Sequence, residues 1–424
     1  MEEKILPILR FDNFNDYWQK SSLLSQVEVR RGLTYKPNDV RSNGARVLRS
    51  SNIVDDSFVI SDDDVFVSKD VINIPRVSNG DILVTAANGS TKLVGKHAII
   101  KNLPDDEIVV HGGFMLLFKT EQNYFVNAWM SSNEYKRVLQ FVQGGNGAIG
   151  NLSSTVLKSM KMSFPSVQEQ SAIGSLFCTL DKLLASYKDN LANYQSLKTT
   201  MLSKMFPKAG QTVPEIRLDG FEGEWERLKM VEIFQIIDGD RGKSYPGEND
   251  FLSVGHTLFL DTGNVKKTGL DFSTTKFISE KKDKELRNGK LNLGDFILTS
   301  RGTLGNVAHY NENIQKRFSS VRINSAMLIL RPLLGDKISP DYILAVLRGN
   351  LISDFMKVNQ VGSAQPHITK KEFSKIKVLV PSNIREQQAI GAYFSNLDNL
   401  INFHQEKISQ LETLKKKLLQ DMFI

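Results

Sequence analysis

The chain has 424 residues, of which 41% are hydrophobic, and this length predicts about two to four domains with apolar cores. A formal net charge of +7 is compatible with a nucleic-acid partner without requiring one, and the single cysteine, Cys178, excludes an internal disulfide and a multi-cysteine metal site. Because no apolar run approaches the ~20 residues that span a bilayer, we expect a cytoplasmic protein without membrane contact.

Residues 1–164 are predicted to form a mixed domain rich in short strands. An apolar run follows Gly80-Asp81, which is the pattern of a turn that leads into a buried strand. Residues 127–142 carry an apolar stripe at helical spacing, which predicts one helix. Residues 157–164 alternate polar and apolar side chains, which predicts a strand.

Residues 165–206 are predicted to contain one long helix. Apolar side chains step through it by mostly alternating threes and fours, the heptad pattern of a coiled-coil seam. Roughly 40 residues at about 1.5 Å each would make a rod of about 60 Å. Prolines and a glycine then predict a linker at 207–225. The seam consists of Ile173, Phe177, Leu180, Leu184, Tyr187, Leu191, Tyr194, Leu197, Met201 and Met205.

The second half of the chain repeats the first. Residues 226–380 are predicted to form a second mixed domain, and residues 381–424 a second long helix. Glu169 recurs as Glu386, an offset of 386 − 169 = 217 residues, and a period near half the chain length indicates an internal duplication. The second seam keeps this offset and consists of Ile390, Phe394, Leu397, Ile401, His404, Ile408, Leu411, Leu414, Leu418 and Met422.

The starts of the two halves also repeat, since Pro7, Arg10, Asp12, Phe14 and Trp18 return as Pro214, Arg217, Asp219, Phe221 and Trp225. The predicted fold class is therefore α+β, with two similar mixed domains separated by two long helices in a pseudo-twofold arrangement. Chain order favours an antiparallel coiled coil in which each helix buries the seam of the other. The alternative is that each helix packs only on its own domain.

Two motifs resemble cofactor sites but lack the required context. Residues 240–244 end like a phosphate-binding loop, yet Ile237 stands where that motif needs glycine. Residues 145–150 fit the spacing G-x-G-x-x-G, but a helix is predicted before them and a strand after them, the reverse of a dinucleotide site. The six histidines are scattered and no two prolines are adjacent, so we predict no catalytic residue, no metal site and no methyltransferase signature.

The ordered duplication resembles the specificity subunit of type I restriction–modification systems. The resemblance is carried by Pro165, Glu169, Gln170, Ile173, Gly174, Phe177, Leu180 and Asp181, with Pro381, Glu386, Gln387, Ile390, Gly391, Phe394, Leu397 and Asp398. It implies that each mixed domain is a target recognition domain that reads one half of a split double-stranded DNA sequence. The helices would set the spacing and bind two methyltransferase subunits.

The same resemblance implies a non-catalytic chain without a cofactor of its own. S-adenosylmethionine and ATP would bind to the partner subunits that carry out DNA methylation and restriction. A restriction–translocase subunit is a further possible partner.

The DNA contacts are predicted on polar and basic loops, because donors and acceptors must reach base edges and cations must reach phosphates. The corresponding strand-end loops at 85–90 and 299–303 are favoured. The predicted residues of the first domain are Arg30, Arg31, Tyr35, Lys36, Asn88, Ser90, Lys92 and Asn146. Those of the second domain are Arg241, Lys243, Tyr245, Arg301, Thr303, Ser363, Gln365 and His367.

Two other classes of function stay open from the sequence. One is an adaptor or scaffold whose duplicated domains bind something other than DNA, and it predicts no salt-sensitive DNA binding. The other is a self-sufficient nuclease or methyltransferase, which predicts activity of the purified chain with Mg²⁺ or S-adenosylmethionine.

Overall fold

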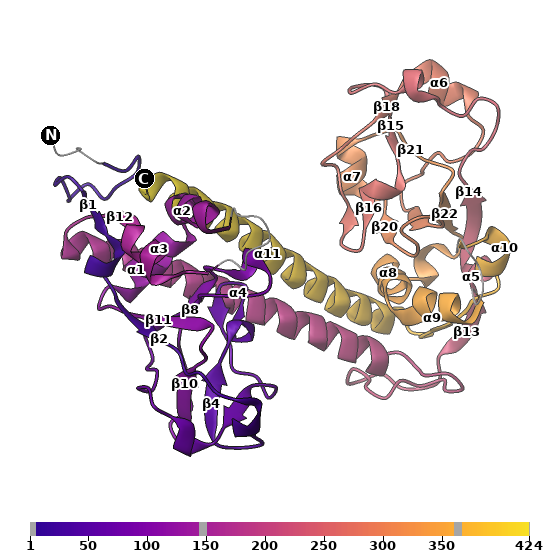
Figure 1. The fold of residues 1–424 in the computed structure, drawn as a ribbon. Coiled ribbons are helices and arrows are strands. Elements are labelled where there is room, and N and C mark those ends of the chain that lie inside the picture. Colours follow the sequence, from indigo (N-terminus) through magenta and orange to yellow (C-terminus); the bar gives the residue numbers. More distant parts are fainter. Residues whose placement is uncertain (1–5, 144–150, 360–366, 424) are drawn as a thin grey trace. The chain divides into compact units, whose positions relative to one another are not determined.

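The computed structural model describes residues 6–143, 151–359 and 367–423, which form two compact units. The first unit consists of residues 1–187 and 407–424, and the second unit consists of residues 188–406. Each unit contains one mixed domain and a part of both long helices, α4 (Val167–Lys204) and α11 (Ile384–Met422) (Figure 1). None of the helices in the described ranges is long and apolar enough to cross a membrane.

The main sheet of the first unit is antiparallel, in the order β2 (Glu28–Arg31), β11 (Met115–Lys119), β8 (Ile82–Thr85) and β9 (His97–Ile99). A second sheet has the order β10 (Ile108–His111), β4 (Ala45–Leu48), β7 (Val65–Val67) and β3 (Val40–Arg41), and its β10–β4 pair is parallel. Two-stranded ribbons join β1 (Gln19–Ser22) to β12 (Lys161–Phe164) and β5 (Ile53–Val54) to β6 (Ser57–Phe58).

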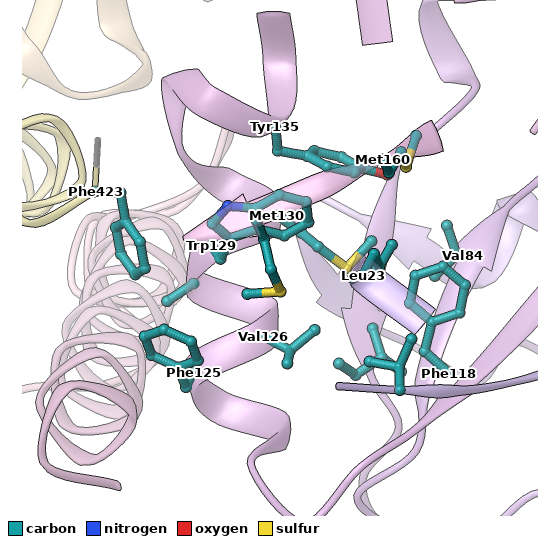
Figure 2. Packing of buried hydrophobic residues seen from close by; sticks show 14 of the residues in the cluster. Leu23, Val84, Phe118, Phe125, Val126, Trp129, Met130, Tyr135, Met160 and Phe423 are labelled. Atoms are coloured by element: carbon teal, nitrogen blue, oxygen red, sulfur yellow. The ribbon is translucent and has the colours of Figure 1, made fainter. Parts of the chain in front are cut away.

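The core of the first unit lies between the main sheet and the long helices. Helix α1 (Asn123–Ser131) supplies Phe125, Val126, Trp129 and Met130, and Figure 2 shows these side chains between those of the sheet and Phe423, which follows α11. Phe423 contacts Phe125 with ring centroids 5.7 Å apart. Trp18, near one end of the sequence, and Phe423, near the other, therefore belong to the same core.

The second unit repeats this topology. Its main sheet has the order β14 (Phe234–Asp238), β22 (Met327–Pro332), β19 (Phe296–Thr299) and β20 (Val307–His309). Its second sheet has the order β21 (Val321–Ile323), β15 (Thr257–Leu260) and β18 (Phe277–Ile278), and the β21–β15 pair is again parallel. Ribbons join β13 (Glu226–Lys229) to β23 (Lys377–Val380) and β16 (Val265–Lys266) to β17 (Gly269–Leu270).

The helices correspond as well. The first unit has α1, α2 (Asn133–Gln143) and α3 (Ser154–Ser159) where the second has α8 (Pro340–Arg348), α9 (Asn350–Asn359) and α10 (Lys370–Phe373). The second unit also has α5 (Met230–Ile233), α6 (Glu280–Glu285) and α7 (Glu312–Arg317). The duplication seen in the sequence is thus present in the strand order and helix order of the two units.

Two predicted elements were wrong in detail. The single helix expected at 127–142 is two helices, because Ser132 between α1 and α2 has an extended backbone and its hydroxyl accepts a hydrogen bond from the Tyr135 N–H (3.4 Å). The strand expected at 157–164 begins only at Lys161, since the Ser153 hydroxyl caps the short helix α3. Alternation over so few residues did not distinguish the last helical turn from a strand.

Within each unit the two long helices run antiparallel. In the first unit the Lys415 ammonium lies 2.6 Å from the Asp181 carboxylate, while Phe177, earlier on α4, contacts Phe423, after the end of α11. In the second unit Lys198 lies 2.5 Å from Asp398, and Tyr194 contacts His404. As residue numbers fall on one helix they rise on the other.

Most of the predicted seam residues are buried, others are half-buried, and two are exposed. Buried are Ile173, Phe177, Leu180, Leu184, Ile390, Phe394, Leu397 and Ile401, while Leu191 and Ile408 are half-buried. Leu197 and Leu414 were wrongly assigned to the seam, because both are exposed and the next residue takes the inward place. Strict alternation of fours and threes reaches Lys198 and Lys415, whose ion pairs with aspartate place a polar contact in each seam.

Most of the residues that carry the duplication hold the long helices to their own domains. Arg10 donates two hydrogen bonds to Glu169 (2.7 and 2.6 Å), and Arg217 does the same to Glu386 (2.7 and 2.8 Å). The side chain of Gln170 donates to the carbonyl of Pro165 at 3.0 Å. We call the pairs Arg10–Glu169 and Arg217–Glu386 the arginine–glutamate fastening. Each pair connects the start of a mixed domain to the start of the long helix that follows it.

The repeated glycine permits close helix packing. A Cβ on Gly174 would lie 2.9 Å from the backbone nitrogen of Phe125, and one on Gly391 would lie 2.6 Å from that of Tyr342. Helix α4 therefore packs closely on α1, and α11 packs closely on α8. A larger residue in place of either glycine would push the two helices apart. The helices contact their own domains as well as each other, so the two packing alternatives drawn from the sequence are combined.

Candidate nucleic-acid interface

Loops of the first unit meet at one end of its main sheet. The strand β2 leads into Leu33, whose N–H donates to the His111 carbonyl (2.7 Å). At the β10–β11 turn, the Phe114 carbonyl accepts from Ala86, in the loop after β8, at 2.9 Å. Leu152 in turn donates to the Ala86 carbonyl (2.8 Å). We call the segments 32–39, 86–94, 112–114 and 151–153 the first loop cluster.

The second unit builds the same arrangement. Ser300, after β19, donates to the Ala326 carbonyl in the β21–β22 turn (2.8 Å), and Ile368 donates to the Ser300 carbonyl (2.9 Å). Gly239, after β14, donates to the Met327 carbonyl (3.4 Å). We call the segments 239–247, 300–306, 324–326 and 367–369 the second loop cluster.

A glycine fixes the course of the chain where each cluster begins. A Cβ on Gly32 would lie 1.9 Å from the Gly112 carbonyl oxygen, and one on Gly239 would lie 2.1 Å from that of Asn324. Real side chains essentially never approach so closely, so both positions need glycine. The chain leaving the first strand of the main sheet can then cross directly over the neighbouring turn.

The predicted residues of β2 and the loop after it differ in exposure. Arg30 pairs with Glu28 at 2.7 Å, and the exposed Arg31 donates to the hydroxyl of Ser154 at 2.6 Å. Tyr35 is half-buried against the core of the second sheet, whereas Lys36 is exposed. Lys36 is thus available to a partner, while much of the Tyr35 ring serves the fold.

The predicted residues of the loop after β8 are partly engaged with the protein. The Asn88 amide donates to the hydroxyl of Ser50 (3.2 Å), and its oxygen accepts from the Ser90 N–H (3.0 Å). Ser90 and Lys92 are exposed. Asn146, also predicted, lies outside the described residues.

In the second unit, the loop after β14 holds three predicted residues. The Arg241 guanidinium donates to the Ser325 carbonyl (3.1 Å) and lies 3.6 Å from the Asp238 carboxylate. Lys243 is exposed, whereas Tyr245 is half-buried with its ring against Phe259.

Arg301 and Thr303 are exposed in the loop after β19. The Arg301 N–H donates to Ala326 (3.1 Å), and the Thr303 carbonyl accepts from the hydroxyl of Thr299. His367 is exposed at the start of the last segment of this cluster. Ser363 and Gln365 lie outside the described residues.

The loop that resembles a phosphate-binding motif is organised by an aspartate. Burial would raise the pKa of Asp240, but hydrogen bonds from the N–H groups of Gly242 and Arg287 lower the pKa overall. The charged carboxylate therefore ties the backbone of this loop down. In the first unit, burial lowers the pKa of His111 beside its loop cluster, which favours the neutral imidazole.

One residue of the first cluster was missed in the sequence. Phe114 is 75% exposed in the β10–β11 turn, and the corresponding residue of the second unit is Ala326. Two glycines precede Phe114, and a Gly-Gly-aromatic turn between two apolar runs was a signal that could have identified it.

A groove of about 600 Å³ in the second unit lies elsewhere, between the end of α4, the helices α8 and α9 and the strand β23. It shares no residue with the second loop cluster. Within the described ranges there is no group of three or more histidine, cysteine, aspartate or glutamate residues that could hold a metal ion.

The chain is similar to several known proteins. Residues 222–413 match the family described as the Type I restriction modification DNA specificity domain. The chain is 24% identical over 423 residues to the MjaX specificity subunit of Methanocaldococcus jannaschii, covering 95% of this chain and 92% of that protein. It is 23% identical over 431 residues to the type I restriction enzyme EcoKI specificity subunit of Escherichia coli, covering 96% and 88%.

The fold is similar to the crystal structure of the S subunit of a type I restriction–modification system from M. genitalium, with a TM-score of 0.65. The two are 16% identical in sequence, and the match covers 99% of each chain. The resemblance expected from the repeated sequence pattern is thereby confirmed: this chain is similar to the specificity subunits of type I restriction–modification systems.

Proposed function

We propose that this chain is the DNA sequence-specificity subunit of a type I restriction–modification complex and reads a split double-stranded target. The observation that carries the proposal is that the same loop cluster occurs twice on the same sheet topology with different side chains. A duplicated framework with divergent tips suits two half-sites of different sequence. The chain itself is non-catalytic in this proposal and needs no cofactor.

Both loop clusters present exposed lysines and exposed polar side chains, which suit different parts of DNA. Exposed Lys36, Lys92 and Lys243 suit phosphate oxygens, which fix the position of a protein on DNA without reading sequence. Arg301 suits the two acceptors that guanine presents in the major groove. Ser90, Thr303 and His367 offer further donors and acceptors to base edges.

The proposed domains are a first target recognition domain at 1–164, a spacer helix at 165–206, and a linker with the start of the second repeat at 207–225. A second target recognition domain follows at 226–380 and a second spacer helix at 381–424. The helices would form one antiparallel coiled coil with pseudo-twofold symmetry. Since one DNA face recurs about every 34 Å, a stiff spacer of fixed length would let two readers address separated half-sites.

The partner surfaces are proposed on the outward leucines of the helices. Leu183 and Leu414 of the first unit and Leu400 and Leu197 of the second are between 37 and 45% exposed. Leu183 and Leu400 are equivalent in the repeat, as are Leu197 and Leu414. Two equivalent apolar patches suit two copies of one partner, the methyltransferase subunit, which would bring S-adenosylmethionine. A restriction subunit that uses ATP could join that complex.

The proposed function is tested by expressing this chain with a type I methyltransferase subunit and mapping methylated adenines in the host DNA. We expect a split motif, and exchanging one mixed domain for that of a relative should change one half of it. A stable complex that methylates no new sites would contradict the proposal and favour a scaffold that binds something other than DNA.

The partner surfaces are tested separately by the double variant Leu183→Glu and Leu414→Glu. Native mass spectrometry should then find one methyltransferase subunit per chain in place of two, because only the patch of the first unit is charged. Ser186→Glu, at an exposed polar position of α4, is the control and should retain both. Retention of both subunits by the double variant would exclude these leucines as the docking surface.

A further inference from the structure

The β10–β11 turn of the first unit presents an unusual side chain to solvent. Phe114 is 75% exposed, more than any other aromatic residue that the structure describes. The loop after β2 packs against the preceding Gly113, where an added Cβ would lie 3.2 Å from the Thr34 hydroxyl and 3.3 Å from the Leu33 carbonyl oxygen. The exposed phenyl ring is thus carried by a turn that contacts the other loops of the first loop cluster.

The backbone that carries this ring is firmly held. The Phe114 carbonyl accepts hydrogen bonds from both Ala86 (2.9 Å) and Ala87 (3.1 Å). The turn is closed by the Met115 N–H, which donates to the Gly112 carbonyl at 2.8 Å. Exposure of the ring is thus a property of an ordered turn between two strands. The exposed ring lies within the loop cluster that is proposed to meet DNA, where an apolar group of a base could cover it and supply the stabilisation of burial.

The second unit lacks this feature. At the same turn it has Ala326, which is half-buried and whose carbonyl holds Ser300 and Arg301 as the Phe114 carbonyl holds Ala86 and Ala87. The two turns are therefore equivalent in backbone and differ in what they project. The apolar feature that DNA offers in the major groove is the 5-methyl group of thymine, which a phenylalanine side chain can contact.

We infer that Phe114 contacts the 5-methyl group of a thymine in the half-site read by the first unit and specifies that position. This inference rests on the proposed function. It assigns to the first unit an apolar contact in addition to its polar donors and acceptors. The ring reads a methyl group at the edge of a base pair and leaves the base pairs stacked.

The experiment uses the complex of this chain with its methyltransferase subunits and a duplex containing the methylated target. Each thymine of the first half-site is replaced in turn by deoxyuridine, which removes one methyl group and keeps the base pair. For the wild-type complex we expect one replacement to weaken binding about fourfold, the effect of one buried methyl group. For the complex with Phe114→Ala, the same replacement should have no further effect.

Leu24→Ala is the matched control, since Leu24 is also an exposed apolar residue but precedes β2, at the other end of the strand from Gly32. This variant should keep the wild-type response to deoxyuridine. The inference is overturned if no single replacement weakens wild-type binding, or if Phe114→Ala responds as the wild type does. A rise in 2-aminopurine fluorescence next to the site, lost in Phe114→Ala, would overturn it in favour of insertion between base pairs. A wild-type complex that binds no methylated target would instead overturn the proposed function itself.

Discussion

The two units share a framework of strands and helices and differ in their loop clusters, which form the tips of the units. The order of the main sheet, the parallel pair in the second sheet and the arginine–glutamate fastening occur in both. The loop between the last two strands of the main sheet spans residues 86–96 in the first unit and only 300–306 in the second. Phe114 and Ala326 occupy equivalent turns. The units thus differ most in their loop clusters, where residues such as Lys36, Lys243 and Phe114 are exposed and can change with little effect on the framework.

The frameworks also differ at one internal position. Asp398 of the second unit pairs with Lys198 and also with Arg348 (3.2 Å), whereas α1 ends with Ser131 where α8 ends with Arg348. Burial lowers the pKa of the Arg348 guanidinium, which Asp398 partly offsets. The second unit therefore relies more on charge at this point than the first unit does.

The largest expected loss of stability comes from neutralising the glutamate of the arginine–glutamate fastening. In Glu169→Gln, Arg10 loses the charge of a carboxylate that is fully buried, and the cost should be about 3 kcal/mol. Glu386→Gln should cost about as much, because Glu386 is equally buried against Arg217. Hydrogen exchange read by mass spectrometry should find lost protection in the first unit for one variant and in the second unit for the other.

Glu28→Gln, which alters an exposed pair with Arg30, is the control and should leave protection unchanged. Loss of protection in both units from either fastening variant would show that the two frameworks are not independently stabilised.

A change at the tips should affect recognition in one half-site. Arg301→Ala should cost about 2 kcal/mol at one base pair of the second half-site, the range for a two-pronged contact to guanine. Binding selection from a library randomised at both half-sites measures this. Lys92→Ala, in the first loop cluster, should instead weaken binding uniformly and lower its salt dependence. A uniform loss from Arg301→Ala would reassign Arg301 to a phosphate.

The repeated glycines should respond differently to one added methyl group. In Gly391→Ala, the new Cβ would lie 2.6 Å from the Tyr342 backbone nitrogen, a clash that should cost about 2 kcal/mol. Alanine offsets about 1 kcal/mol of this through its helix propensity. Gly174→Ala brings its new Cβ 2.9 Å from the Phe125 backbone nitrogen, a smaller overlap, and should cost less than Gly391→Ala. Equal shifts in the midpoints of urea unfolding would contradict this ranking.

The smallest effect is expected where the frameworks differ. Asp398→Asn removes a partner from both Lys198 and Arg348 and should cost about 1 kcal/mol. Asp181→Asn removes one partly exposed pair with Lys415 and should cost about half as much. Urea unfolding of the two variants should reveal this order, and raising the salt concentration should reduce both effects. An equal cost would mean that Arg348 finds other partners.

The sequence predicted the framework better than the tips. Arg10 and Glu169 were recognisable because they recur with their neighbours, and the structure explains the recurrence by their hydrogen bonds. Gly80-Asp81 was also recognisable, because it recurs as Gly294-Asp295 before the corresponding strand. Asp81 and Asp295 each accept a hydrogen bond from the turn and pair with a basic residue of the neighbouring strand. Repetition identifies such residues because the same contact is needed twice.

Other features were not accessible from the sequence. Leucine was preferred to lysine in the seam because hydrophobicity carries no information about an ion pair made with a distant helix. Tyr35 and Tyr245 were predicted as ligand contacts, yet both are half-buried in small cores whose members come from distant strands. Loop residues lack periodicity, so their exposure depends on tertiary contacts that a single sequence does not display.

The composition of the first unit has a consequence for biosynthesis. Met422 and Phe423 belong to the core that also contains Trp18 and Phe125, whereas the second unit is made of one continuous stretch. Because synthesis proceeds from the N-terminus, all of residues 188–406 leave the ribosome before residues 407–424 do. The unit that is synthesised first is therefore the last to be completed, and part of its core stays uncovered until residues 422 and 423 have left the ribosome.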